Sequence, residues 1–294
     1  MLASGRVSPW AWHAHPDVWL VVVALAVAYW WSVRALGPAY APPGRPAVTR
    51  RQVTQFALGL LALWVHADWP VHDIGEQYLF SVHMVQHIGF MLIAAPLLIL
   101  GTPAWLVRHL LGTGRRRALF ARLTRPLAAG LIFSLVTVLT HWPLVVNEAL
   151  ESELIHLLVH LGILVSAVLM WFPVLNRDRA LPTMSPPARM LYVFLQSVIP
   201  TIPAAFLTFA DTALYRFYDE VARPFAISAV EDQQLAGALM KVYAGLLLWG
   251  VIVVMFFRWY AADSRDKAPA GRDGVLTWDD VERELARAPT APPG

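Results

Sequence analysis

Four histidines form two pairs at the spacing of one helical turn, His83 with His87 and His156 with His160, and each pair lies in a strongly apolar stretch. Side chains four residues apart share one face of an α-helix, so each stretch can present two imidazoles in one direction. Imidazole is the commonest metal ligand among protein side chains, and ionisable groups inside a membrane are costly and usually functional. The spacing therefore predicts metal or proton chemistry within apolar helices.

The apolar stretches around these histidines predict an integral membrane protein. Of the 294 residues, 57% are hydrophobic and 15% are charged, which is too apolar a balance for a soluble globular domain. A helix needs roughly 20 apolar residues to cross a bilayer. We expect an all-α fold, a polytopic membrane helix bundle with seven transmembrane helices at residues 18–36, 53–69, 77–100, 127–142, 154–175, 191–210 and 234–260. Ala26-Val27-Ala28 resembles a signal-peptide cleavage site, but the apolar run continues through Trp31, so we expect the first span to be retained.

The distribution of arginine predicts how the bundle is oriented. Arginines gather in the loops at 37–52, 101–126 and 176–190 and after the seventh span, whereas the loops before the third and fifth spans are acidic. Because basic loops remain in the cytoplasm, the N-terminus is expected outside and the C-terminus in the cytoplasm. We expect residues 1–262 to form the seven-span domain and residues 263–294 a flexible cytoplasmic tail with a short helix.

On this topology nine of the ten histidines lie on the outer side, and only His109 does not. His83 follows Glu76 by seven residues and His160 follows Glu153 by seven, so both lie on the order of 10 Å below the outer ends of their helices. Two such helices facing each other would form a cage of four imidazoles. The predicted metal ligands are His83, His87, His156 and His160.

Further residues near the outer ends of the spans could complete or orient this cage. Thioethers add soft ligands, and carboxylates can hold imidazoles in position. The additional metal-binding or orienting residues predicted in this way are His66, His72, His141, Met84, Met240, Glu76, Asp211, Glu231 and Asp232. His13 and His15 are expected to reside at the membrane interface. Lys241 is expected to snorkel outward or to pair with Asp232 or Asp211.

Composition and motif content disfavour several classes of function. The chain has no cysteine, so disulfides and thiolate metal sites are excluded, and a soft metal must be bound by Met or His. The net charge of +3 comes with arginines beside the spans, where they contact the lipid bilayer, so no nucleic-acid partner is expected. Residues 83–87 lack the glutamate of a His-Glu-x-x-His zinc protease, and no nucleophile–base arrangement stands out, so we do not expect an enzyme.

Several short motifs resemble one known family. His-Met-Val-Gln-His at 83–87, followed by an apolar run with Pro96 and Gly101, is similar to the CtaG-type cytochrome c oxidase assembly factors. So are His141-Trp142-Pro143, the segment of His156 and His160, and Asp232-Gln233-Gln234-Leu235-Ala236-Gly237. The resemblance extends from about Trp64 to about Arg258, and the elements at 83–87 and 232–237 are its most specific parts. Lys241 departs from the family pattern, in which an aromatic residue follows the Met240 position.

The resemblance implies a multi-pass protein of the bacterial plasma membrane that helps to mature a heme–copper oxidase. It implies the cytochrome c oxidase catalytic subunit as partner, extracytoplasmic copper chaperones as further partners, and copper, as Cu(I), as a transient cofactor. Imidazole and thioether both accept Cu(I), so the implied function agrees with the predicted cage. The absence of cysteine excludes the single-span, cysteine-using copper chaperone that shares the CtaG label.

Three other functions fit the same residues. Heme could take histidines from facing helices as axial ligands. A copper or proton transporter would need a polar path to the cytoplasmic side, and the inner halves of the predicted spans are almost wholly apolar. A metal-free scaffold that only docks the oxidase would tolerate substitution of the histidines.

Overall fold

The computed structural model describes residues 8–176, 178, 180–267 and 278–287, and the regular elements among them are all helices. Residues 1–252 form one compact unit and residues 253–294 form a second. The second unit contains the helix α17 (Trp278–Arg287), which lies in the predicted tail. The all-helical class is therefore confirmed, while the domain boundary at residue 262 stays a prediction.

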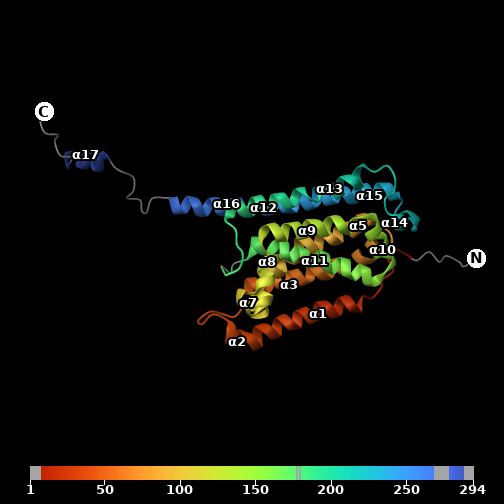
Figure 1. The fold of residues 1–294 in the computed structure, drawn as a ribbon, viewed down its shortest axis with the longest axis horizontal. Coiled ribbons are helices and arrows are strands. Elements are labelled where there is room, and N and C mark those ends of the chain that lie inside the picture. The colour runs from red at the N-terminus through yellow and green to blue at the C-terminus, as the bar shows by residue number, and fades with distance from the viewer. Residues whose placement is uncertain (1–7, 177, 179, 268–277, 288–294) are drawn as a thin grey trace, which may run out of the picture. The chain divides into compact units, whose positions relative to one another are not determined.

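Most helices of the first unit run side by side along one direction (Figure 1). In chain order its helices are α1 (Pro16–Trp31), η1 (Ser32–Leu36), α2 (Gly37–Tyr40), α3 (Arg50–Ala67), α4 (Val71–Gln77), α5 (Phe80–Ile88), η2 (Gly89–Ala94), α6 (Ala95–Gly101), α7 (Ala104–Leu111), α8 (Arg115–Leu123), α9 (Pro126–Thr140), α10 (Pro143–Glu151), α11 (Glu153–Leu175), α12 (Pro186–Val198), α13 (Thr201–Phe209), α14 (Arg216–Glu220), α15 (Ala229–Ala238), η3 (Leu239–Tyr243) and the first part of α16 (Ala244–Lys267). The three η elements are π-helical turns within longer helices.

Five helices are long and apolar enough to cross a membrane, and they coincide with the first, third, fifth, sixth and seventh predicted spans. They are Pro16–Tyr40, Phe80–Gly101, Glu153–Leu175, Pro186–Phe209 and Ala229–Arg265. The fourth predicted span, α9, reaches that length only together with α8, and the two are bent by 71°. The structure therefore supports five spans, or six with the bent pair, and the prediction of seven is not confirmed.

The second predicted span differs from its prediction for a physical reason. Thr49 and Gln52 form a capping box that starts α3 at Arg50, so the first turns of the helix carry Arg50, Arg51, Gln52 and Gln55. Only residues 56–65 form an uninterrupted apolar run. At a rise of about 1.5 Å per residue this run is roughly half the thickness of a hydrocarbon core.

The continuous helix α5–η2–α6 lies at the centre of the first unit. It contacts α3, α11 and α15, and its residues Phe80, Met84, Ile88 and Ala94 are at most 2% exposed. The peripheral helices expose more of their apolar side chains. The helix α1 has no buried residue, and α11 buries His156 but exposes Leu154, Leu157, Leu158 and Leu161. Lipid favours apolar side chains such as leucine and makes a polar imidazole costly. The helix α11 therefore faces lipid with its leucines and the protein interior with His156.

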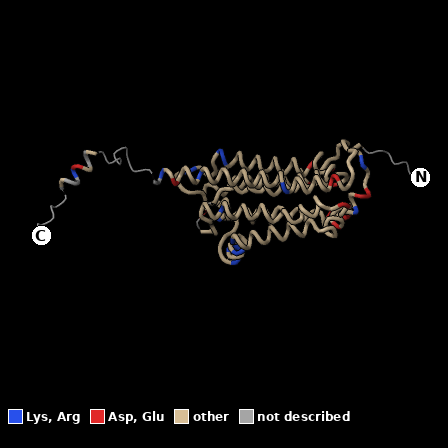
Figure 2. Tube along the Cα trace, turned by 90° about the horizontal axis from the view of Figure 1, so that it is seen from above, with Lys and Arg blue, Asp and Glu red and all other residues tan. Residues whose placement is uncertain are grey.

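Charged side chains separate toward the two ends of the first unit. Figure 2 shows acidic groups gathered where α10 and α14 lie, and a basic cluster at the opposite end, where α7 and α8 lie. This separation follows the arginine pattern from which the orientation was predicted. The orientation itself stays a prediction. We call the end with α4, α10 and α14 the acidic end.

Close packing of α15 on α13 depends on Gly237. A Cβ at this position would meet Thr208 Oγ1 and, at 2.7 Å, the carbonyl oxygen of Ala204. Overpacking of this kind costs about 1–3 kcal/mol, so Gly237→Ala should lower the thermal unfolding temperature of the purified protein. Gly162→Ala on α11 is the matched control, because nothing lies within 4 Å of the place that a Cβ would occupy there, and it should leave the unfolding temperature unchanged or raised. Equal effects of both substitutions would contradict the packing.

Candidate metal centre

The structure brings the two predicted histidine pairs together. His83 and His87 extend from α5, and His156 and His160 extend from the neighbouring α11. The ring centroid of His83 lies 5.7 Å from those of both His156 and His160, and the centroid of His87 lies 5.1 Å from that of His160. The pairs therefore face each other across the interface between two helices.

Three of these imidazoles can share one ion. One ring nitrogen from each of His83, His156 and His160 lies within 4.8 Å of the others, and the Nε2 atoms of His156 and His160 are 3.0 Å apart. Tetrahedral ligands at about 2.0–2.1 Å from a metal are about 3.3 Å from one another. Small movements would therefore close these three side chains, which we call the imidazole trio, around an ion. His87 stands beside the trio, with its ring 4.3 Å from that of His83.

Several ring nitrogens at this place lack a hydrogen-bond partner among the described residues. They are Nδ1 of His83 and both nitrogens of His87, on side chains of residues only 6% and 1% exposed. A buried polar atom without a partner costs about 1–3 kcal/mol. Such atoms occur in folded proteins mainly where a ligand, ion or water completes the site. These nitrogens are therefore available to an ion or a water molecule.

A carboxylate connects the imidazole trio to α4. Oε1 of Glu76 lies 2.8 Å from Nε2 of His156 and 2.7 Å from Nδ1 of His72. Burial raises the pKa of Glu76, but hydrogen bonds from His156 and His72 outweigh burial and hold this pKa well below its usual range. Burial also lowers the pKa of His72, and Glu76 more than reverses this, so the pKa of His72 is raised. Glu76 thus keeps a negative charge beside the cluster, as predicted for an orienting carboxylate.

Replacing Glu76 with Gln should change how stability depends on pH. Because the pKa of His72 is raised in the folded protein, its pairing with Glu76 is fully stabilising below the ordinary histidine pKa of about 6.5 and is lost as pH rises through the raised value. The unfolding temperatures of the wild-type protein and Glu76→Gln should therefore differ most near about pH 6 and less near about pH 9. A difference that does not change with pH would contradict the pairing.

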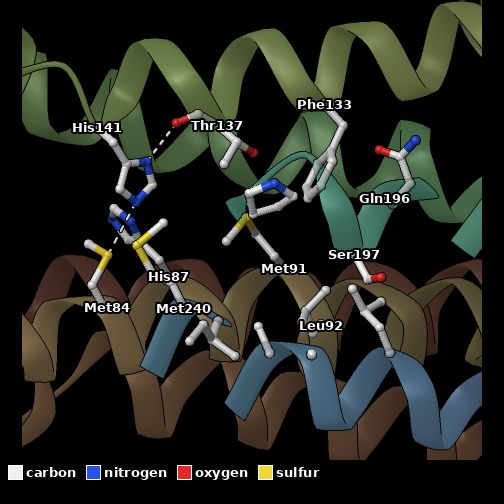
Figure 3. A pocket seen from close by; sticks show the side chains of 15 residues that line it. Met84, His87, Met91, Leu92, Phe133, Thr137, His141, Gln196, Ser197 and Met240 are labelled. Atoms are coloured by element: carbon white, nitrogen blue, oxygen red, sulfur yellow. Dashed lines mark hydrogen bonds between the residues drawn. The ribbon is translucent and has the colours of Figure 1, made fainter. Parts of the chain in front are cut away.

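A small cavity lies on the other side of His87. It measures about 30 Å³ and is lined by His87, His141 and the thioethers of Met84, Met91 and Met240, among other residues. In Figure 3 the side chains of Met84, Met240, His87 and His141 point toward one another. Nε2 of His141 lies 3.2 Å from Sδ of Met84, while its Nδ1 lies 2.6 Å from the carbonyl oxygen of Thr137. The predicted additional ligands His141, Met84 and Met240 are therefore gathered at one place.

Irregular backbone forms the walls of this cavity. The π-helical turns η2 and η3 supply Met91 and Met240, and Pro200, at the break between α12 and α13, also lines it. A π-helical turn removes one backbone hydrogen bond from the helix, and here the indole of Trp171 donates to the carbonyl oxygen of Met91 at 2.8 Å. Such turns are frequent at functional sites. The break at Pro200 thus contributes to the wall of the cavity.

Comparison with known proteins identifies the family. A family model described as cytochrome c oxidase caa3 assembly factor matches residues 11–262. The chain belongs to this family. It is also similar to an uncharacterized protein of Mycobacterium bovis and to one of Mycobacterium tuberculosis, each 25% identical over 268 residues, covering 82% of this chain and 40% of the relative. The chain therefore spans about two fifths of the length of these relatives. No solved structure matches.

The Asp-Gln-Gln-Leu-Ala-Gly element of this family member holds the helix that carries His83 and His87. Oδ2 and Oδ1 of Asp232 accept the backbone N–H groups of Phe80 and Ser81 at 2.7 and 3.1 Å, which caps the start of α5 from another helix. Gln233 accepts the N–H of Leu214 at 2.7 Å. These contacts give Asp232 a role in positioning α5, in place of the imidazole contact that the sequence predicted.

Four other predicted residues lie apart from the imidazole trio. Asp211 is exposed, and Glu231 caps its own helix through Ser228. His66 packs against Gly89 and pairs its Nδ1 with the carbonyl oxygen of Ala62. Lys241 donates to Thr201 Oγ1 at 2.7 Å instead of pairing with Asp232 or Asp211. These residues are placed by contacts with neighbouring turns and helices. The predicted ends of the spans alone therefore could not distinguish these residues from metal ligands.

Sequence reasoning missed a second group of histidines in this family member. His13 and His15 lie against Asp73 of α4, where interface residence was expected. Gln86, on the turn between His83 and His87, faces Nδ1 of His72 at 3.2 Å. The available signal was the adjacent pair His72 and Asp73, four and three residues before Glu76, together with the His-x-His spacing at 13 and 15.

Proposed function

We propose that this assembly factor holds copper as cargo at the imidazole trio and passes it to the catalytic subunit of a heme–copper oxidase in the bacterial plasma membrane. One observation carries the proposal: imidazoles from two helices bring ring nitrogens within 4.8 Å of one another in a member of the caa3 oxidase assembly family. The unpartnered nitrogens of His83 and His87 support it, because metal binding would give buried atoms a partner.

The donor atoms suit copper in its reduced form. The chain offers neutral imidazole and thioether and no thiol, and soft ligands of this kind select Cu(I). His87 lies between the imidazole trio and the cavity that holds Met84 and Met240. His87 therefore separates cargo bound at the trio from the thioethers of Met84 and Met240.

Glu76 makes the bound cargo exchangeable. Nε2 of His156 faces both Glu76, at 2.8 Å, and His160, at 3.0 Å. An ion that binds this nitrogen must displace it from Glu76, and the carboxylate takes it back when the ion leaves. Because Glu76 gives His156 a hydrogen-bond partner after the ion leaves, the free-energy cost of releasing the ion is lower. A protein that delivers metal must release it readily. Because the negative charge of Glu76 also attracts a cation, Glu76→Gln should weaken copper binding.

The heme alternative fits the cavity poorly. The cavity at His87 and His141 measures about 30 Å³, enough for an ion or a water molecule. Pockets for larger organic ligands measure roughly 300–1,000 Å³. A Soret band in the purified protein at one heme per chain would favour heme over copper.

Oxidase maturation in cells tests the delivery role. In a strain that depends on this chain, His83→Leu/His160→Leu should leave the oxidase subunits at normal levels but depleted of copper and activity. His66→Gln, outside the imidazole trio, is the control and should support full maturation. A copper-replete, active oxidase in the double variant would contradict delivery from the trio and would favour a metal-free docking scaffold.

A further inference from the structure

The segment before α1 is attached to α4 by histidines. Nδ1 of His13 lies 2.9 Å from Oδ2 of Asp73, and Nε2 of His15 lies 2.7 Å from Oδ1 of the same carboxylate. The ring of His72 packs edge-on against that of His15, with centroids 4.6 Å apart. Two parts of the chain that are about 60 residues apart thus place three imidazoles around one carboxylate.

The geometry of this group is that of a metal site. One ligand atom from each of His15, His72 and Asp73 lies within 4.8 Å of the others. Glu76 and Gln86 both face Nδ1 of His72, so Nε2 is the ring atom that remains for an ion. The side chain of Asp73 is 4% exposed, while that of His13 is 48% exposed. The carboxylate is therefore buried, and the group is accessible to an ion on the side of His13.

The donor set differs from that of the imidazole trio. It combines imidazole nitrogen with carboxylate oxygen and lacks thioether, and such N,O sites suit divalent transition-metal ions. Among those ions Cu²⁺ binds most tightly by the Irving–Williams order. The negative charge of Asp73 would also compensate part of the charge of a divalent ion in this partly buried place.

We infer that His15, His72 and Asp73, with His13 beside them, form a second metal site that binds a divalent transition-metal ion such as Cu²⁺. This site, which we call the α4 site, is separate from the imidazole trio.

The α4 site also adjoins the imidazole trio. The ring centroids of His72 and His156 are 6.2 Å apart, and Oε1 of Glu76 contacts both side chains. Imidazoles therefore follow one another from His15 through His72 to His156 and His160. The two sites are therefore neighbours. Binding at the α4 site does not depend on the proposed function.

Electron paramagnetic resonance of the Cu²⁺-titrated protein tests the inference. The full chain is purified in detergent without a histidine tag, and His83→Leu/His160→Leu serves as background to remove the imidazole trio. We expect one Cu²⁺ per chain with nitrogen hyperfine structure in that background. His15→Gln/Asp73→Asn should weaken the binding at least about tenfold, the range seen when groups that support a metal are lost. His109→Gln, on α7, is the control and should leave the titration unchanged.

Each other outcome overturns the inference in an identifiable way. A Cu²⁺ signal that survives His15→Gln/Asp73→Asn and disappears in His83→Leu/His160→Leu would show binding at the trio alone, and the proposed function would stand. No nitrogen-coordinated Cu²⁺ in either protein would mean that the histidines only tether the segment before α1. If the double variant at the α4 site unfolds, His15→Gln alone keeps the contact between His13 and Asp73 and should still weaken Cu²⁺ binding at least about tenfold.

Discussion

Replacing His83 and His160 with leucine should abolish tight Cu(I) binding by the purified protein. The double variant removes two of the three imidazoles whose nitrogens lie within 4.8 Å of one another, and it leaves His156 as a single ligand. Substituting residues that hydrogen-bond to metal ligands already lowers metal affinity by about 10–100-fold. Loss of two ligands should therefore raise the Kd for Cu(I) by more than about 100-fold. Competition with a Cu(I) chelator of known affinity measures the change.

The same substitutions should not destabilise the metal-free protein. Leucine approximates the volume of histidine, and it removes the buried Nδ1 of His83, which has no partner among the described residues. We therefore expect an unfolding temperature equal to or above that of the wild-type protein, in keeping with the usual trade between function and stability. His66→Gln should change neither the Cu(I) affinity nor the unfolding temperature by much. A large loss of stability without loss of copper would identify the histidines as structural.

Asp232→Ala should have the largest effect on stability among single substitutions near the site. It leaves the backbone N–H groups of Phe80 and Ser81 unpartnered in a region where Asp232 is 0% exposed. Hydrogen bonds to a charged group contribute about 1.5–3 kcal/mol each, so we expect a loss of about 3–6 kcal/mol for the two. At about 2–4 °C per kcal/mol for a chain of this size, that loss lowers Tm by about 6–24 °C, measurable by thermal unfolding in detergent.

Asp232→Ala should also weaken copper binding, since α5 carries His83 and begins at the capped residues. Glu231→Ala is the matched control, because Glu231 is the exposed member of a capping box with Ser228 and its loss should lower Tm by much less than the loss of Asp232. If the two substitutions lower Tm equally, Asp232 does not hold α5 in place.

The two histidine pairs could be predicted because their signal is local. Four-residue spacing in an apolar run indicates one helix face, and inward orientation follows from the cost of an imidazole in lipid. The five helices long enough to cross a membrane were also predicted from local composition. The second predicted span is not confirmed, because a capping box at Thr49 starts α3 in a polar segment, which a search for apolar runs does not weigh.

The missing parts of the site depend on contacts between distant residues. Asp232 caps a helix that begins 152 residues earlier in the chain, and His15 meets Asp73 across 58 residues. Neither contact has a periodicity that a single sequence reveals. The π-helical turns that supply Met91 and Met240 to the cavity likewise have no periodic signal in the sequence. In η2 the indole of Trp171 donates to the carbonyl oxygen of Met91.

X-ray absorption of the Cu(I)-loaded protein tests the central claim most directly, because it reports the atoms bound to copper. We predict one copper per chain with the multiple scattering of coordinated imidazole in the wild-type protein, weakened in Glu76→Gln and absent in His83→Leu/His160→Leu. Coordinated imidazole of unchanged intensity in the His83→Leu/His160→Leu protein would contradict copper binding at the imidazole trio.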